Sequence, residues 1–284
     1  MKRKAAIYLA VILLAVLFLS TEALSNAEEE FHQTYRVKVN TEVEVKNING
    51  DVHISGWDED YVDVRALKRT KRDQSELDKV TIEVRIDDVM KIETVHKKHS
   101  QDDDDTFFKR VFGNMGLSSP KVTVEYTIRI PQSVILGRVE TLNGNVKLND
   151  TRGDTIIHSV NGNIIAEKTN GLIEAKTTNG DINITGDAGV REARTTNGSI
   201  KVSIPDDGDD NIRISSTNGS IDVYLSPDID AGLDLKTTNG RISARDFRIT
   251  MDTVSSRRFV GTLGSGGKTI SVRTTNGSIN LFEK

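Results

Sequence analysis

The chain has 284 residues, no cysteine, 5% aromatic residues and a formal net charge of −4. Without cysteine it cannot use a thiol nucleophile, a cysteine-bound zinc or iron–sulfur site, or disulfide bonds. The mildly acidic charge balance argues against a general nucleic-acid binder. Mainly small and branched side chains are left to form the core, which is typical of a β-rich protein.

The chain begins with the pattern of an export signal. A basic start at residues 2–4 precedes fifteen unbroken apolar residues, 5–19, as in secretory signal peptides. Small residues before the acidic run predict cleavage after Ala27, which makes 1–27 a signal peptide. An uncleaved N-terminal anchor is the alternative, although a membrane-spanning helix needs roughly 20 residues. Both interpretations place the rest of the chain outside the cytoplasm.

Residues 28–140 are interpreted as the N-terminal, β-rich part of the same domain as the repeats that follow. Val43, Val45, Val52 and Ile54 alternate with polar residues around an Asn-Gly pair, which indicates two strands with one buried face. Further strands, one short helix and a mobile loop are expected. The strands cover 61–64, 80–86, 89–95 and 121–130, the helix lies within 71–80, and the loop covers 97–119.

A regular repeat fills residues 141–284. Glycines recur every nine residues from Gly144 to Gly198, and asparagine precedes every second one. The repeat unit is therefore about 18 residues long and consists of two similar halves. After most of these glycines, apolar residues at the second and fourth positions alternate with polar ones, as in a strand with one buried face.

Asparagine–glycine pairs are predicted to mark the corners of this repeat, with glycine supplying the positive φ of a tight turn. Because the same side chains recur in the same phase, stacked coils with a ladder of hydrogen-bonded asparagines are favoured over a meander of antiparallel hairpins. The pairs are Asn49-Gly50, Asn143-Gly144, Asn161-Gly162, Asn179-Gly180, Asn197-Gly198, Asn218-Gly219, Asn239-Gly240 and Asn276-Gly277.

These patterns predict an all-β fold, a single β-solenoid whose coils have about 18–21 residues and two short strands each. Proline cannot donate to a ladder, so Pro131, Pro205 and Pro227 are expected at strand ends or in loops. The last coil ends near the C-terminus, and Glu283 and Lys284 are expected to cap its exposed edge.

Three motifs follow one another in a characteristic order. They are Asn-Gly-Asp-Val-His-Ile-Ser-Gly-Trp-Asp at 49–58, a strand led by Pro131, and repeated Thr-Asn-Gly-x-Ile coils. In this order, residues 36–284 resemble the putative-adhesin family of bacterial and archaeal envelope proteins, and more distantly the toast-rack domains of envelope-stress proteins. The resemblance implies a β-solenoid, export or membrane association, and no established catalytic residues.

No cluster of residues in the repeat predicts catalysis, a metal site or a cofactor. His96 and His99 would point to opposite faces of a strand, which argues against joint metal binding. In the predicted loop, the acidic run 102–105 is interpreted as solubilising, and the phenylalanines of 107–112 as a cap or a contacting tip. The acidic residues of the repeat do not recur in one phase and are interpreted as a solvated face; they are Asp150, Asp154, Glu167, Glu174, Asp181, Asp187 and Glu192.

The sequence favours a non-enzymatic exported or cell-envelope protein that presents a rigid surface for adhesion or protein contacts. Its partner is an unknown protein or cell surface, nucleic acid is not expected, and membrane contact is limited to residues 5–19 if they are uncleaved. Self-association end to end or along an edge is a further option. The alternatives are a membrane-tethered accessory of envelope-stress signalling and, less favoured, a polysaccharide-active β-helix enzyme.

Overall fold

The computed structural model describes residues 27–284, apart from 97–120, 187, 207, 209 and 245–248. The predicted signal segment up to residue 26, the 97–119 loop and His99 therefore lie outside the described residues. Among the described residues, no helix has the length and apolar character needed to cross a membrane.

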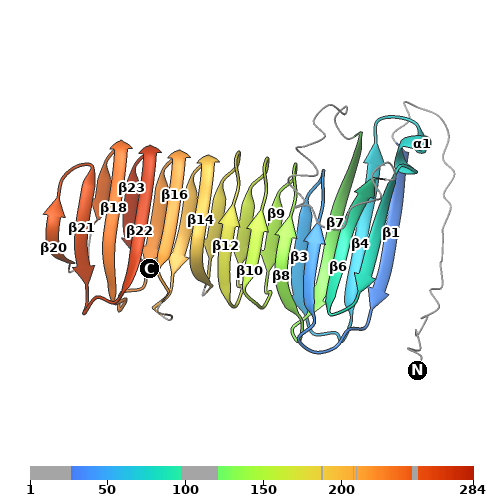
Figure 1. The fold of residues 1–284 in the computed structure, drawn as a ribbon, viewed down its shortest axis with the longest axis horizontal. Helices are drawn as coiled ribbons and strands as arrows, with labels where there is room; N and C mark the ends of the chain where they lie inside the picture. Colours follow the sequence, from blue (N-terminus) through green and yellow to red (C-terminus); the bar gives the residue numbers. More distant parts are fainter. Residues whose placement is uncertain (1–26, 97–120, 187, 207, 209, 245–248) are drawn as a thin grey trace, which may run out of the picture.

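Two long β-sheets enclose one core along the length of the molecule (Figure 1). Sheet A has the spatial order β1 (Ala27–Tyr35), β4 (Val62–Thr70), β7 (Val122–Pro131), β3 (Val52–Trp57), β9 (Val146–Asn149), β11 (Ile164–Glu167), β13 (Ile182–Thr185), β15 (Ile200–Ile204), β17 (Ile221–Leu225), β23 (Ile279–Glu283) and β19 (Ile242–Ala244).

Sheet B lies opposite sheet A, and the short helix α1 (Gln74–Leu77) sits at the N-terminal end of the molecule (Figure 1). Sheet B has the order β20 (Ile249–Val254), β21 (Arg258–Leu263), β18 (Ala231–Asn239), β22 (Lys268–Asn276), β16 (Ile212–Asn218), β14 (Gly189–Asn197), β12 (Leu172–Lys176), β10 (Thr155–His158), β8 (Ile135–Glu140), β2 (Glu42–Lys46), β6 (Val89–His96) and β5 (Val80–Ile86).

The middle of the molecule is a parallel β-solenoid, as predicted. Ile164 pairs with Val146 on one side and with Ile182 on the other, one coil of 18 residues apart in each case. This parallel register excludes the alternative of antiparallel hairpins for these coils. Among the described strands, antiparallel pairs occur only toward the two ends, at β1–β4–β7 and β5–β6 and at β18–β21–β20.

The alternating pattern of each strand explains the core. Val146 and Leu148 of β9 and Ile164 and Ala166 of β11 are 0% exposed, while the residues between them point outward. In the middle coils, from β9 to β13, each strand buries two side chains between the sheets, so small and branched residues fill this space. Pro131, Pro205 and Pro227 lie at or just beyond strand ends, as expected.

The C-terminal coil is not the last coil in space. β22 lies between β16 and β18, and β23 lies between β17 and β19. The expectation that Glu283 and Lys284 cap the exposed final edge is therefore wrong. In the inserted position both edges of β22 and β23 find hydrogen-bond partners, whereas an outermost coil would leave one edge unpaired.

The expected reason for glycine at the corners is also wrong for several coils. Gly50 has a positive φ of 113°, but Gly162 and Gly180 do not. A Cβ atom built on Gly180 would lie 2.0 Å from the carbonyl oxygen of Gly162 in the preceding coil. Close stacking of the corners, rather than backbone handedness, excludes a side chain at these positions.

Candidate binding surface

The predicted corner asparagines form one continuous ladder along the solenoid. Each side-chain Nδ2 donates to the side-chain Oδ1 of its neighbour at 2.7–2.8 Å. The ladder follows the spatial order of the coils and not the order of the sequence. It contains Asn49, Asn143, Asn161, Asn179, Asn197, Asn218, Asn276 and Asn239.

A second set of side chains fixes the same corners from inside. From the third corner onward, a buried threonine or serine lies two residues before each ladder asparagine. Its hydroxyl donates a hydrogen bond to a glycine carbonyl of the neighbouring coil, as Thr195 Oγ1 does to Gly180 O at 2.9 Å. The equivalent donors are Ser159, Thr177, Ser216, Thr237 and Thr274. The corner asparagines and glycines are therefore structural, and they hold the outer faces of the sheets in a fixed register.

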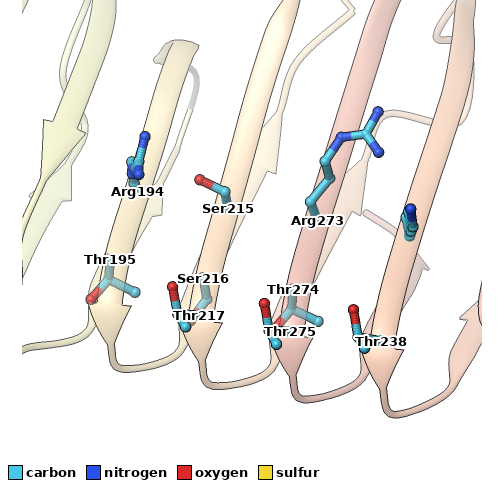
Figure 2. Close-up of a pocket in the computed structure, with 10 residues that line it drawn as sticks. Arg194, Thr195, Ser215, Ser216, Thr217, Thr238, Arg273, Thr274 and Thr275 are labelled. Carbon is cyan, nitrogen blue, oxygen red and sulfur yellow. The ribbon is translucent and has the colours of Figure 1, made fainter.

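A shallow groove of about 320 Å³ lies on the outer face of sheet B, toward the C-terminal end. Figure 2 shows Thr217, Thr275 and Thr238 in one row near the strand ends. Arg194, Ser215 and Arg273 form a second row beside it in the same view. We call this the outer-face groove; it is lined by Arg194, Thr195, Ser215, Ser216, Thr217, Lys236, Thr238, Arg273, Thr274 and Thr275.

Strand register aligns the cations of the groove. Arg194 pairs with Ser215, Ser215 with Arg273, and Arg273 with Lys236 on successive strands. Arg258 of β21 continues the same row beside Lys236. Neighbouring strands lie about 4.8 Å apart, so this row of five positions is about 19 Å long.

In the N-terminal half of sheet B, glutamates neutralise the lysines of the same row. Lys46 lies 3.5 Å from Glu93. Lys176 contacts Glu174 at 2.7 Å and Glu192 at 2.8 Å. Burial alone would lower the pKa of Lys176, but the two carboxylates outweigh it and raise that pKa. This half of the face therefore has little charge to offer a partner.

The cations of the groove have fewer carboxylate partners than Lys46 and Lys176 have. Arg273 contacts Asp234 at 2.5 Å, whereas Arg194 and Lys236 have no ion pair within the part of the chain that the structure describes. Both side chains are exposed. Arginine and lysine offer several charged N–H donors, and the threonine hydroxyls beside them both donate and accept. The arrangement is suited to binding an anionic, hydroxyl-rich partner.

A second charged cluster occupies the outer face of sheet A near the N-terminal end. Asp63 is 2% exposed and accepts hydrogen bonds from His32 at 2.6 Å, Arg129 at 2.7 Å and Arg65 at 3.1 Å. Burial raises the pKa of Asp63, but these three partners outweigh it and hold the pKa below its usual value. Arg129 also lies over the ring of Trp57 at 4.2 Å. The cluster ties β1, β4 and β7 together and has a structural role.

The acidic residues singled out from the sequence are distributed among structural contacts. Asp154 and Asp181 accept backbone N–H groups of the next coil at 2.9 and 2.7 Å. Glu174 and Glu192 bind Lys176, and Glu167 lies 3.7 Å from Lys147. Among the described residues, no group of three or more potential metal ligands comes together. Asp187 and His99 lie outside that part of the chain.

The outer-face groove has no recognisable pattern in the sequence. Its cations are separated by 37 to 79 residues in the chain, and nothing in the local pattern distinguishes Arg194 from paired cations such as Lys176. One sequence feature could have pointed to the groove. The second threonine of the Thr-Thr-Asn-Gly motif recurs at Thr238 and Thr275 and is exposed in both coils. Register, which depends on the unexpected order of the coils, brings these residues together.

Residues 173–282 match the family model described as Toastrack DUF4097. No curated protein matches the chain. Several solved structures resemble the chain, and three of them share 12–14% identity with it.

A putative cell adhesion protein from Clostridium sporogenes shares 13% identity, with a TM-score of 0.35, over 91% of this chain and 100% of its own. A putative adhesin from Bacteroides fragilis shares 12%, with a TM-score of 0.42, over 89% and 97%. A putative lipid binding protein from Parabacteroides distasonis shares 14%, with a TM-score of 0.43, over 89% and 96%. The family match over residues 173–282 confirms the resemblance to the toast-rack domains for that part of the chain.

Proposed function

We propose that this protein is a non-enzymatic binding module of the cell exterior or cell envelope. In this role the β-solenoid acts as an adhesin-like scaffold whose outer-face groove makes the contact. The observation that carries the proposal is the alignment of Arg194, Arg273 and Lys236 with exposed hydroxyls on adjacent strands.

Rigidity of the scaffold supports a binding role. Hydrogen bonds of 2.7–2.8 Å from Nδ2 to Oδ1 link the asparagines of neighbouring corners. The buried hydroxyls of Thr195 and Thr274 donate to glycine carbonyls of neighbouring coils. The strand positions that carry the groove residues are therefore fixed relative to one another before a partner arrives. A pre-organised surface loses less conformational entropy on binding, which raises its affinity.

The predicted export signal in residues 1–27 agrees with an extracytoplasmic place of action. Outside the cell, a surface that relies on charged N–H donors and hydroxyls meets anionic polymers, lipids and proteins. Long-range attraction by the cations speeds the first encounter, and the hydroxyls add short-range contacts. We therefore assign the contact to sheet B rather than to sheet A.

Bead adhesion tests the proposal. Beads coated with the full-length protein are expected to adhere to cells of the source organism, and adhesion is expected to fall as salt rises. The variant R194Q/K236Q removes two groove cations and is expected to lose most of the adhesion. The control K147Q/K201Q removes two cations from the outer face of sheet A and is expected to adhere like the parent. Equal adhesion of both variants would refute the assignment.

A further inference from the structure

We propose that the outer-face groove binds a linear acidic polysaccharide, a sugar chain that carries carboxylate or sulfate groups at intervals. This inference rests on the proposed binding function and names the chemical class of the partner. The occupant is placed along the solenoid axis, across strands β14, β16, β22, β18 and β21. This choice of occupant follows from the spacing of the cations, the row of hydroxyls and the composition of the lining.

The arginines recur at every second strand. Arg194, Arg273 and Arg258 lie on β14, β22 and β21, with Ser215 and Lys236 on the strands between them. Two strand spacings are about 10 Å, so guanidinium groups recur at about that interval along the axis. The planar guanidinium fork matches the two oxygens of a carboxylate or sulfate group. A linear polymer with repeated anionic groups is complementary to such a row.

A row of hydroxyls runs parallel to the row of cations. Thr217, Thr275 and Thr238 are exposed on adjacent strands and line the same groove (Figure 2). Hydroxyls both donate and accept hydrogen bonds, as the hydroxyls of a sugar ring do. An acidic polysaccharide presents anionic groups and hydroxyls on one chain, so it engages both rows at once.

The composition of the lining distinguishes this partner from other polyanions. All ten groove residues are arginine, lysine, serine or threonine. Binding of single-stranded nucleic acid relies on aromatic side chains on which the bases stack. Attachment to a membrane surface relies on apolar side chains that enter the lipid. The described lining of the groove offers neither kind of contact.

The contrast between the two halves of sheet B supports a site rather than a general surface charge. In the N-terminal half, Lys46 and Lys176 each contact a glutamate within 3.5 Å. Toward the C-terminal end, Arg194 and Lys236 have no ion pair among the described residues, and Lys236 lies directly beside Arg258 of β21. Unpaired like charges on adjacent strands destabilise a sheet. A bound polyanion removes that repulsion.

Direct binding measurements with purified full-length protein test the inference. The probes are polygalacturonate, dextran sulfate, uncharged dextran, single-stranded DNA and vesicles that contain phosphatidylglycerol. We expect saturable binding of one or both acidic polysaccharides, weaker binding of DNA and vesicles, and none of dextran. R194Q/K236Q is expected to weaken polysaccharide binding at least tenfold, and K147Q/K201Q less than twofold. Circular dichroism of each variant checks that it is folded.

Three outcomes would overturn the inference: tighter binding of DNA or vesicles than of both acidic polysaccharides, equal binding of dextran and dextran sulfate, or equal loss in the two variants. The bead assay separates this failure from that of the proposed function. If R194Q/K236Q abolishes cell adhesion and no acidic polysaccharide binds, the groove is a contact surface with a different partner. If adhesion is unchanged as well, the groove is not the contact surface.

Discussion

Replacing Gly180 with alanine tests why glycine occupies the corners of the solenoid. The added Cβ would lie 2.0 Å from the carbonyl oxygen and 2.5 Å from the carbonyl carbon of Gly162. An ordinary contact needs more than 3 Å, so the two coils must separate by about 1 Å at this corner. Because both atoms of Gly162 belong to the backbone, no side chain is able to move aside.

The expected loss in the free energy of unfolding follows from the hydrogen bonds at this corner. Separation disrupts the bond from Gly162 N to Asn179 O at 2.9 Å and the bond from Thr177 Oγ1 to Gly162 O at 3.0 Å. Two bonds contribute about 2 kcal/mol, and overpacking adds about 1–3 kcal/mol. Replacement of glycine stabilises by about 0.4–1 kcal/mol through the unfolded state. Gly180→Ala should therefore lower the free energy of unfolding by about 2–4 kcal/mol.

Equilibrium urea unfolding followed by circular dichroism measures this change, and Gly232→Ala is the matched control. A Cβ on Gly232 would lie 4.0 Å from Thr269 Oγ1, the nearest atom outside the adjacent residues of the chain. Alanine in that strand should leave stability unchanged or raise it by up to about 1 kcal/mol. If Gly180→Ala is as stable as Gly232→Ala, close stacking is not the reason for glycine at the corners.

Four further substitutions probe the ladder, the buried hydroxyls and the Asp63 cluster. Asn179→Ala removes two ladder bonds and should cost about 1–2 kcal/mol in urea unfolding, about twice the cost of Asn239→Ala at the ladder end. Equal costs would contradict an additive ladder. Thr195→Val keeps the shape, loses the bond to Gly180 O and should cost about 1 kcal/mol; no loss would show that the hydroxyl is dispensable. Asp63→Asn should cost about 1–3 kcal/mol at pH 7. Because partners lower the folded-state pKa of Asp63, its contribution is complete above the unfolded-state pKa of about 4 and is lost as pH falls through the folded-state pKa. Thermal unfolding against pH should therefore show parent and variant converging below about pH 4; a constant difference down to pH 2 would contradict this role.

The middle of the fold was predictable from the sequence because its signals are local. Alternation at Val146 and Leu148, and at Ile164 and Ala166, identified the strands and their buried faces. The 18-residue recurrence of Asn143 and Asn161 identified the stacking and the ladder. Strands 80–86 and 89–95 matched β5 and β6 to within one residue, and the short helix fell inside 71–80.

The order of the last coils was not predictable in this way. The motif Thr-Thr-Asn-Gly-x-Ile occurs both at Asn239-Gly240 and at Asn276-Gly277, so this motif does not indicate which of the two coils lies next to the preceding one. The choice depends on long-range pairing, since β18 pairs with both β21 and β22. Pairing across a strand edge is a property of the assembled sheet and leaves no local pattern.

The outer-face groove depends on the same long-range pairing. Arg273 lies next to Ser215 and Lys236 only because β22 is inserted between β16 and β18. If the coils stacked in sequence order, Lys236 would lie beside Ser215, and Arg273 would lie beyond both. The candidate binding surface is therefore a consequence of the tertiary order, and residue types alone did not indicate it.

Lysine footprinting tests most directly whether the outer-face groove is the contact surface. The full-length protein is acetylated with and without cells of the source organism, and the modification rate of each lysine is read by mass spectrometry. We predict that Lys236 is protected at least threefold by the cells, while Lys147 and Lys201 on sheet A react at unchanged rates. Protection of Lys147 and Lys201 with an unchanged rate at Lys236 would contradict the proposed contact surface.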